Sequence, residues 1–209
     1  MRVSGLKIST LALVLVALVL ALVRVASAQD VYKVNYFSNN TVAGAPDATV
    51  RIDNPGLTYG NLCAMIYVFA ADQQMAECCG CIESHNNLNT YSVSTNLASP
   101  LYTLTGQYTP SGVIKIVSAL PSGSGGGGVV DPPVCDPTSA YKPTANLRAW
   151  ATHVQNVVAG KFPITETEFS DSPLGATELA NLQAQCSFIN ILGSGYGICN
   201  CASGGETAE

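Results

Sequence analysis

The stretch that decides the expected fold is residues 62–81, LCAMIYVFAADQQMAECCGC. Residues 62–71 are apolar on both of the faces that an extended chain presents, which predicts a central strand covered on both sides of a packed sheet. Asp72 and Gln73 predict a turn, and residues 74–79 are expected to return antiparallel to the first strand. A buried hairpin is therefore expected at the centre of a β-rich protein.

Short strands are also expected on either side of this hairpin. Their sequences favour extended chain, and they are separated by Asn, Gly and Pro clusters that predict turns. These expected strands are residues 31–37, 49–53, 90–95 and 112–120. Because no sustained helical period occurs in this half, residues 29–120 are predicted to form an antiparallel β-sandwich-like domain.

A Gly/Pro-rich stretch separates this domain from a smaller, mixed C-terminal region. Residues 121–134, PSGSGGGGVVDPPV, have the composition of a linker that is flexible at first and stiffer at its end. Residues 135–209 are expected to add strands and one helix to a mainly β, disulfide-stapled protein. The sequence leaves open whether the two halves pack as one domain.

Within the C-terminal region, residues 164–169, ITETEF, alternate in polarity and predict a strand. Residues 144–158 fit both a helical period and a strand composition; their Trp, Thr and Val content favours the strand. Residues 173–192 predict one amphipathic helix. Its apolar positions are Leu179, Leu182, Cys186 and Ile189, and Gly193-Ser194-Gly195 follows as a C-terminal cap.

Residues 1–28 have the three parts of a cleavable secretory signal. Arg2 and Lys7 form a short positive region, and residues 11–23 form an apolar core that is too short to span a membrane. The small residues Ala26 and Ala28 then predict cleavage between Ala28 and Gln29. The expected location of the mature protein is secreted, periplasmic or at the cell surface.

The eight cysteines all lie in the predicted mature chain. An even number of cysteines behind a secretory signal predicts disulfides in an oxidising compartment. Four precede the linker and four follow it, which favours two locally closed sets. The disulfide candidates are Cys63, Cys78, Cys79, Cys81, Cys135, Cys186, Cys199 and Cys201.

Chain geometry restricts their pairing without fixing it. Neighbouring Cα atoms are about 3.8 Å apart, too close for an ordinary disulfide, so Cys78 and Cys79 are expected to have different partners. Cys63 is the expected partner of one of these two cysteines. In the second set, Cys186 is expected to pair with Cys199 or Cys201, and Cys135 with the remaining cysteine.

Several stretches together resemble a group of exported cysteine-rich proteins of environmental bacteria. The stretches are CAMIYVF, AECCGC and GVIKIVS in the first half, and LRAW, TETEF and GSGYGICNC in the second. The resemblance covers most of the mature chain. It implies export and carries no known activity, so it says nothing about chemistry.

The cysteine clusters and one carboxylate pair are the candidate chemical sites. Thiolates in the CCGC and CNC clusters could bind a metal or exchange electrons, although their spacing is not that of a zinc ribbon and export favours disulfides. Glu166 and Glu168 share a face of the expected strand, which is the kind of carboxylate pair a glycan hydrolase uses. Alternation with threonines describes an ordinary polar face equally well.

No other motif predicts an enzyme. His85 and His153 are the only histidines, and no G-x-S-x-G elbow accompanies them. His85 is expected in solvent, and His153 is expected to be packed or at the surface. The alternating glycines at 193–197 follow the predicted helix, so they fit a cap better than a phosphate loop, which opens a helix. We therefore expect no cofactor.

The mature chain is acidic. Cleavage removes three of nine basic residues and none of fourteen acidic ones, leaving a net charge of −8. Nucleic acid and anionic membranes attract basic surfaces, so neither is an expected partner. The sequence predicts a secreted, non-catalytic structural, adhesive or binding protein that meets extracellular proteins or glycans, with self-association by strand addition. Tyr102, Tyr108 and Tyr141, near prolines, are the tyrosines expected at the surface.

Overall fold

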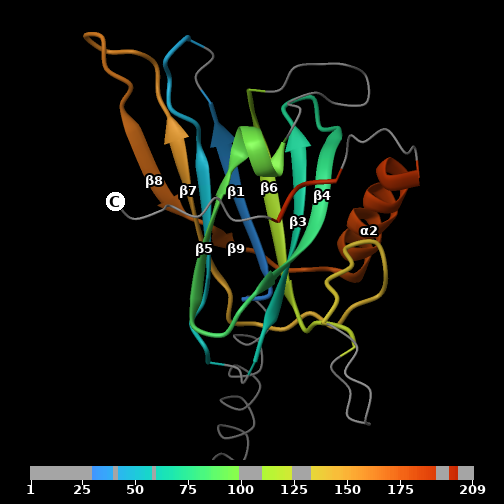
Figure 1. Ribbon diagram of the computed structural model, residues 1–209. Helices are drawn as coiled ribbons and strands as arrows, with labels where there is room; N and C mark the ends of the chain where they lie inside the picture. The colour runs from blue at the N-terminus through green and yellow to red at the C-terminus, as the bar shows by residue number, and fades with distance from the viewer. Residues whose placement is uncertain are drawn as a thin grey trace, which may run out of the picture.

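The computed structural model describes residues 30–39, 42–57, 60–98, 110–123, 133–191 and 198–201 (Figure 1). Several predictions concern residues outside these ranges. They are the signal peptide with its cleavage site at Ala28 and Gln29, most of the linker, Tyr102 and Tyr108, and the glycines at 193–197.

The described residues form one nine-stranded mixed sheet with a single long helix, which confirms the mainly β class. Along its main path the strand order is β4-β3-β6-β1-β7-β2-β5, while β8 pairs with β7 and β9 with β1. The strands are β1 (Tyr32–Ser38), β2 (Thr49–Asn54), β3 (Leu62–Ala70), β4 (Met75–Glu83), β5 (Asn87–Ser92), β6 (Ser111–Ala119), β7 (Arg148–Val154), β8 (Ile164–Glu168) and β9 (Ser170–Asp171).

Strand β3 is the buried central strand that its sequence predicts. It pairs antiparallel with β4 on one edge and with β6 on the other. Because side chains alternate along a strand, Ala64 and Ile66 enter the core inside the curled sheet, while Met65 and Tyr67 enter a second core on its outer face. The return strand β4 is likewise confirmed.

The sheet curls until its two end strands, β4 and β5, approach each other at the front of Figure 1. These two strands are consecutive in the chain and are joined by the short turn at residues 84–86. Curling gives one sheet an enclosed interior, so the sandwich-like packing comes from a single half-barrel-like layer. Large buried residues inside it include Phe37, Ile52, Tyr91 and Ile116.

The two halves of the chain pack together in one sheet. Strand β7, from the C-terminal half, lies between β1 and β2 of the N-terminal half and pairs antiparallel with β2. Ala149 and Phe169 therefore share the interior core with Phe37 and Val50. Residues on both sides of the linker therefore form one sheet and share its interior core, and residues 148–154 adopt the favoured strand conformation.

The predicted helix is α2 (Ala176–Ile191), which lies against the outer face of the sheet beside β4 (Figure 1). Leu182, Cys186 and Ile189 follow the helical period and are buried in the same outer-face core as Met65 and Tyr67 of β3, whereas Leu179 is only partly buried.

The strand expected at residues 90–95 begins and ends earlier, at Asn87 and Ser92. A π-helical turn, η2 (Val93–Leu97), follows it. The Ser92 hydroxyl accepts a hydrogen bond from the Thr95 amide and also bonds to the Asp47 carboxylate. Capping by Ser92 therefore ends the strand, an effect that weak polarity alternation does not reveal.

Candidate functional site

All four disulfides of the structure join the two halves of the chain, so the expected pairing within each half is wrong. The observed pairs are Cys63–Cys135, Cys78–Cys186, Cys79–Cys199 and Cys81–Cys201. The separate partners expected for Cys78 and Cys79 are confirmed. Alternation along β4 explains them, because Cys78 faces the outer core beneath α2 whereas Cys79 and Cys81 face the interior.

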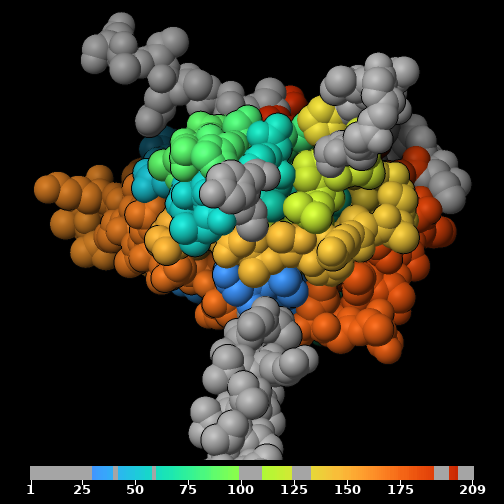
Figure 2. Space-filling view, turned by 90° about the horizontal axis from the view of Figure 1, so that it is seen from below, coloured from blue at the N-terminus to red at the C-terminus, as the bar shows by residue number. Residues whose placement is uncertain are grey.

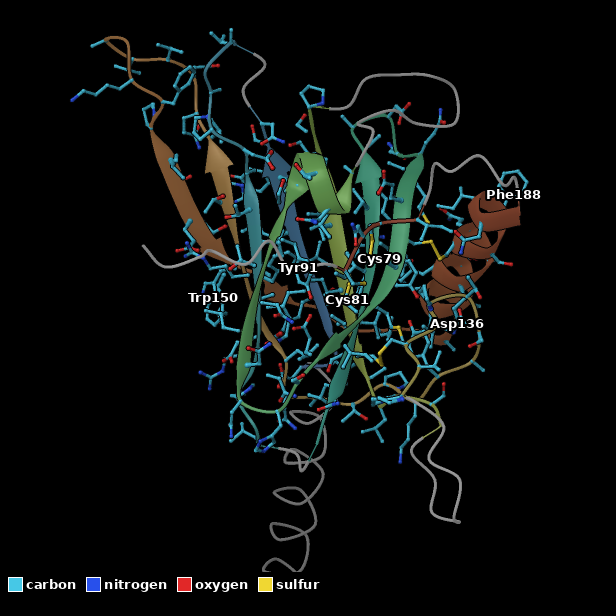
Figure 3. All side chains as sticks on the ribbon, viewed as in Figure 1. Cys79, Cys81, Tyr91, Asp136, Trp150 and Phe188 are labelled. Carbon is cyan, nitrogen blue, oxygen red and sulfur yellow. A yellow bond between two sulfur atoms is a disulfide. The ribbon has the colours of Figure 1, made fainter. Side chains whose placement is uncertain are left out.

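Residues 198–201, which we call the C-terminal strap, lie between β4 and η2. The Cys199 amide donates to the Cys78 carbonyl at 3.3 Å, and the Asn200 amide donates to the Asn96 carbonyl at 2.7 Å. Two disulfides fix the strap to β4, and their β4 cysteines, Cys79 and Cys81, are labelled in Figure 3. The strap therefore bridges the curled sheet near the place where its end strands meet.

The sulfur atoms of the strap region form a compact cluster. Cys79 Sγ lies 3.6 Å from Cys81 Sγ, and the sulfurs of Cys79, Cys81 and Cys201 all lie within 4.8 Å of one another. All three sulfurs are bonded in disulfides here. Because metals bind thiolates, the cluster as observed is two neighbouring disulfides and not a ligand set.

The carboxylates Glu166 and Glu168 lie two residues apart on β8, and both are exposed. Glu166 Oε1 accepts a hydrogen bond from Arg51 Nη1 at 2.7 Å in an exposed ion pair. Glu168 lies opposite Trp150 of β7 in the strand register. The structure thus shows one paired and one solvated carboxylate on an open strand, an arrangement typical of a polar surface.

His153 is fully buried at the end of β7. Its ring stacks on Tyr36, with centroids 3.8 Å apart, and its Nε2 lies 2.8 Å from the Thr167 hydroxyl. Burial lowers the pKa of His153, which favours the neutral imidazole. His85 is exposed in the β4–β5 turn, as expected, and its Nδ1 lies 3.0 Å from the side-chain Nδ2 of Asn86.

The buried carboxyl group of Glu83, at the end of β4, is a feature that sequence reasoning missed. The Tyr91 hydroxyl donates to Oε1 at 2.8 Å, and Asn89 Nδ2 donates to Oε2 at 2.7 Å. Burial nevertheless raises the pKa of Glu83 to about 7, and nearby Asp53 acts in the same direction. Its sequence context, IESHNN, is typical of a solvated loop and gave no signal of burial.

A groove of about 600 Å³ lies between the end of β6 and residues 133–143. Figure 2 shows these residues, in yellow, on the lower face beside the yellow-green end of β6. We call it the 134–143 groove; its lining includes Leu120, Val134, Tyr141 and Pro143, with Asp136 and Lys142 as its charged members.

Two side-chain connections hold the wall of this groove against β3. The Cys63–Cys135 disulfide fixes one end of the wall. The Tyr67 hydroxyl donates to the Pro137 carbonyl at 3.0 Å and lies 2.9 Å from the Tyr141 hydroxyl. Tyr141, expected at the surface, is therefore half-buried and part of the outer core.

These features define a class of protein: a single curled β-sheet with one outer helix, cross-linked by four disulfides. Comparisons with protein families, curated proteins and solved structures found no match. Among the described helices, none is both long enough and apolar enough to cross a membrane.

Proposed function

We propose that the protein is an exported, non-catalytic binding protein that holds a segment of another extracellular protein in the 134–143 groove. The groove itself carries the proposal, because it combines a volume of about 600 Å³ with a largely apolar lining on a cross-linked wall. Concave, largely preformed surfaces with a few polar groups are typical binding sites.

The chemistry of the lining favours a polypeptide ligand. Leu120 and Val134 are 40% and 49% exposed, so each presents apolar surface that a partner side chain could cover. Asp136 and Lys142 supply opposite charges close to this apolar surface. A hydrogen bond from Thr138 lowers the pKa of Asp136, which keeps its carboxylate ionised.

Export is supported by two independent features. The first is the signal-like sequence of residues 1–28. The second is the set of four disulfides that leaves no free cysteine among the described residues. Disulfides persist in oxidising compartments outside the cytosol, so both features favour a secreted, periplasmic or cell-surface location.

A peptide-display library panned on the mature, disulfide-bonded protein tests the proposal. Retained peptides are then titrated calorimetrically against wild type and the groove variants Leu120→Asp and Val134→Asp. Each variant is expected to weaken binding about tenfold or more, equivalent to about 1.4 kcal/mol. Leu88→Asp is the matched control, because Leu88 is 54% exposed on β5 and outside the groove lining.

Three outcomes would overturn the proposal. The first is that the library yields no retained peptide. The second is that the Leu88→Asp control loses as much affinity as the groove variants. The third is that a glycan array detects binding in the groove while the peptide library detects none.

A further inference from the structure

The two disulfides of the C-terminal strap are spaced alike on both of the segments they join. Cys79 and Cys81 are two residues apart on β4, and Cys199 and Cys201 are two residues apart on the strap. Because side chains at i and i+2 share a face of an extended chain, the two disulfides lie side by side. Cys79 Sγ of one disulfide lies 3.6 Å from Cys81 Sγ of the other, although the two sulfurs are not bonded to each other.

The two sulfurs of the outer disulfide differ in accessibility. Cys81 is fully buried, whereas Cys201 is exposed on the strap. A thiolate arriving from solution therefore reaches Cys201 Sγ, and the thiolate displaced from this disulfide is that of Cys81. The released Cys81 sulfur then lies beside the second disulfide, in the position of an attacking nucleophile.

We propose that the strap is a thiol–disulfide exchange site at which a small thiolate converts the Cys79–Cys199 and Cys81–Cys201 disulfides into Cys79–Cys81 and Cys199–Cys201. The conversion detaches the strap from β4. It is an isomerisation, because two disulfides are consumed, two are formed, and the small thiolate is regenerated.

The exchange takes three balanced steps. In the first step, the external thiolate attacks Cys201 Sγ, forming a mixed disulfide and releasing the Cys81 thiolate. In the second, the Cys81 thiolate attacks Cys79 Sγ, forming Cys79–Cys81 and releasing the Cys199 thiolate. In the third, the Cys199 thiolate attacks the mixed disulfide at Cys201, forming Cys199–Cys201 and releasing the external thiolate. No oxidant or reductant is consumed.

The position of the strap makes the exchange structurally significant. The strap lies between β4 and η2, and Cys199 is part of the interior core. Detaching it removes the two covalent links that hold it over the region between these elements. The other two disulfides, Cys63–Cys135 and Cys78–Cys186, are unchanged, so the groove wall and α2 remain cross-linked to the sheet.

Mass spectrometry of wild-type protein treated with a substoichiometric amount of glutathione tests the proposal. After acid quenching, pepsin cleavage between Cys186 and Cys199 and non-reducing analysis, the expected new species is a free C-terminal peptide with an internal disulfide. If this peptide always remains linked to the β4 peptide, or leaves only as a dithiol after net reduction, the proposal is wrong.

The variant Cys201→Ala tests the central step without an external thiol. It leaves Cys81 as the cysteine without its original partner, beside the Cys79–Cys199 disulfide. Because Cys81 and Cys199 are both buried, the protein is unfolded mildly in acid and then alkylated rapidly. Both Cys81 and Cys199 are expected to be labelled, because the second step transfers the free thiol between them. Labelling of Cys81 alone would show that the 3.6 Å approach does not lead to exchange.

The matched control is Cys135→Ala, which frees Cys63 from the disulfide at the groove. The fully buried Cys63 thiol is expected to be the single site labelled, after mild unfolding in acid followed by rapid alkylation. Label spread over several cysteines in this control would indicate general scrambling and would count against a specific exchange at the strap.

Discussion

The substitution Glu83→Gln should remove a pH-dependent destabilisation built into the interior of the sheet. Burial raises the pKa of Glu83 from its ordinary value near 4.5 to about 7, so the folded protein holds the proton more tightly than the unfolded chain. Each pKa unit corresponds to about 1.4 kcal/mol, so this shift corresponds to about 3 kcal/mol.

The sign follows from which state binds the proton. Well below pH 4.5 the carboxyl group is protonated in both states and makes no pH-dependent contribution to stability. As the pH rises toward about 7, the unfolded chain releases the proton first, so the stability of the wild type falls by up to about 1.4 kcal/mol per pH unit. Above about pH 7 the full destabilisation of about 3 kcal/mol is present.

Denaturant unfolding of the disulfide-intact protein, repeated across this pH range, measures the effect. Between about pH 4.5 and 8, the wild type is expected to lose about 3 kcal/mol more unfolding free energy than Glu83→Gln does. His153 acts in the opposite sense: its lowered pKa costs stability as pH falls through 6.5, but this contribution is common to both proteins and cancels.

A variant at an exposed carboxyl group is the control. Glu168→Gln changes the net charge by the same amount at a solvated site on β8. Parallel curves for wild type and Glu83→Gln, or an equal pH effect in the control, would refute the reasoning from burial.

Two further predictions concern packing. On α2, Leu182→Ala should reduce the unfolding free energy by about 2–5 kcal/mol, because Leu182 is buried in the outer-face core. Phe188→Ala should change it by about 0.5 kcal/mol or less, because Phe188 is 59% exposed and points away from the body in Figure 3. In β4, Gly80→Ala should lower the free energy of unfolding, measured with denaturant, by about 1–3 kcal/mol, because a Cβ there would lie 2.1 Å from the Cys135 carbonyl oxygen. Gly175→Ala is the control and should leave the stability unchanged, because no atom lies within 4 Å of the added Cβ.

The strands were predictable from the sequence where burial alone dictated the residue pattern. Strand β3 is covered on both faces, so an unbroken apolar run was its signature, and the helix α2 showed the period of its one buried stripe. At residues 144–158 the β-favouring composition predicted the strand that is observed, although the helical period fitted as well. In β7, alternation places the small alanines in the interior and leaves Trp150 half-buried.

The disulfide pairing could not be predicted, because it depends on which strands become neighbours. Cysteines in the same half of the chain were expected to pair, but β7 enters the sheet between β1 and β2 and α2 returns to β4. Cys78 and Cys79 therefore meet Cys186 and Cys199, at sequence separations of 108 and 120 residues. The burial of Glu83 was not predicted for the same reason, because it results from strands that the curling of the sheet brings together.

The connectivity also constrains how the protein can be made. No native disulfide can form until Cys135 has been synthesised, and the last two require Cys199 and Cys201. During N-to-C synthesis, the four cysteines between residues 63 and 81 emerge together with only one another as partners. Oxidation at that stage produces non-native pairs, whose reshuffling takes seconds to hours unless it is catalysed. Efficient biogenesis therefore requires either late oxidation or a disulfide isomerase in the compartment where the chain folds.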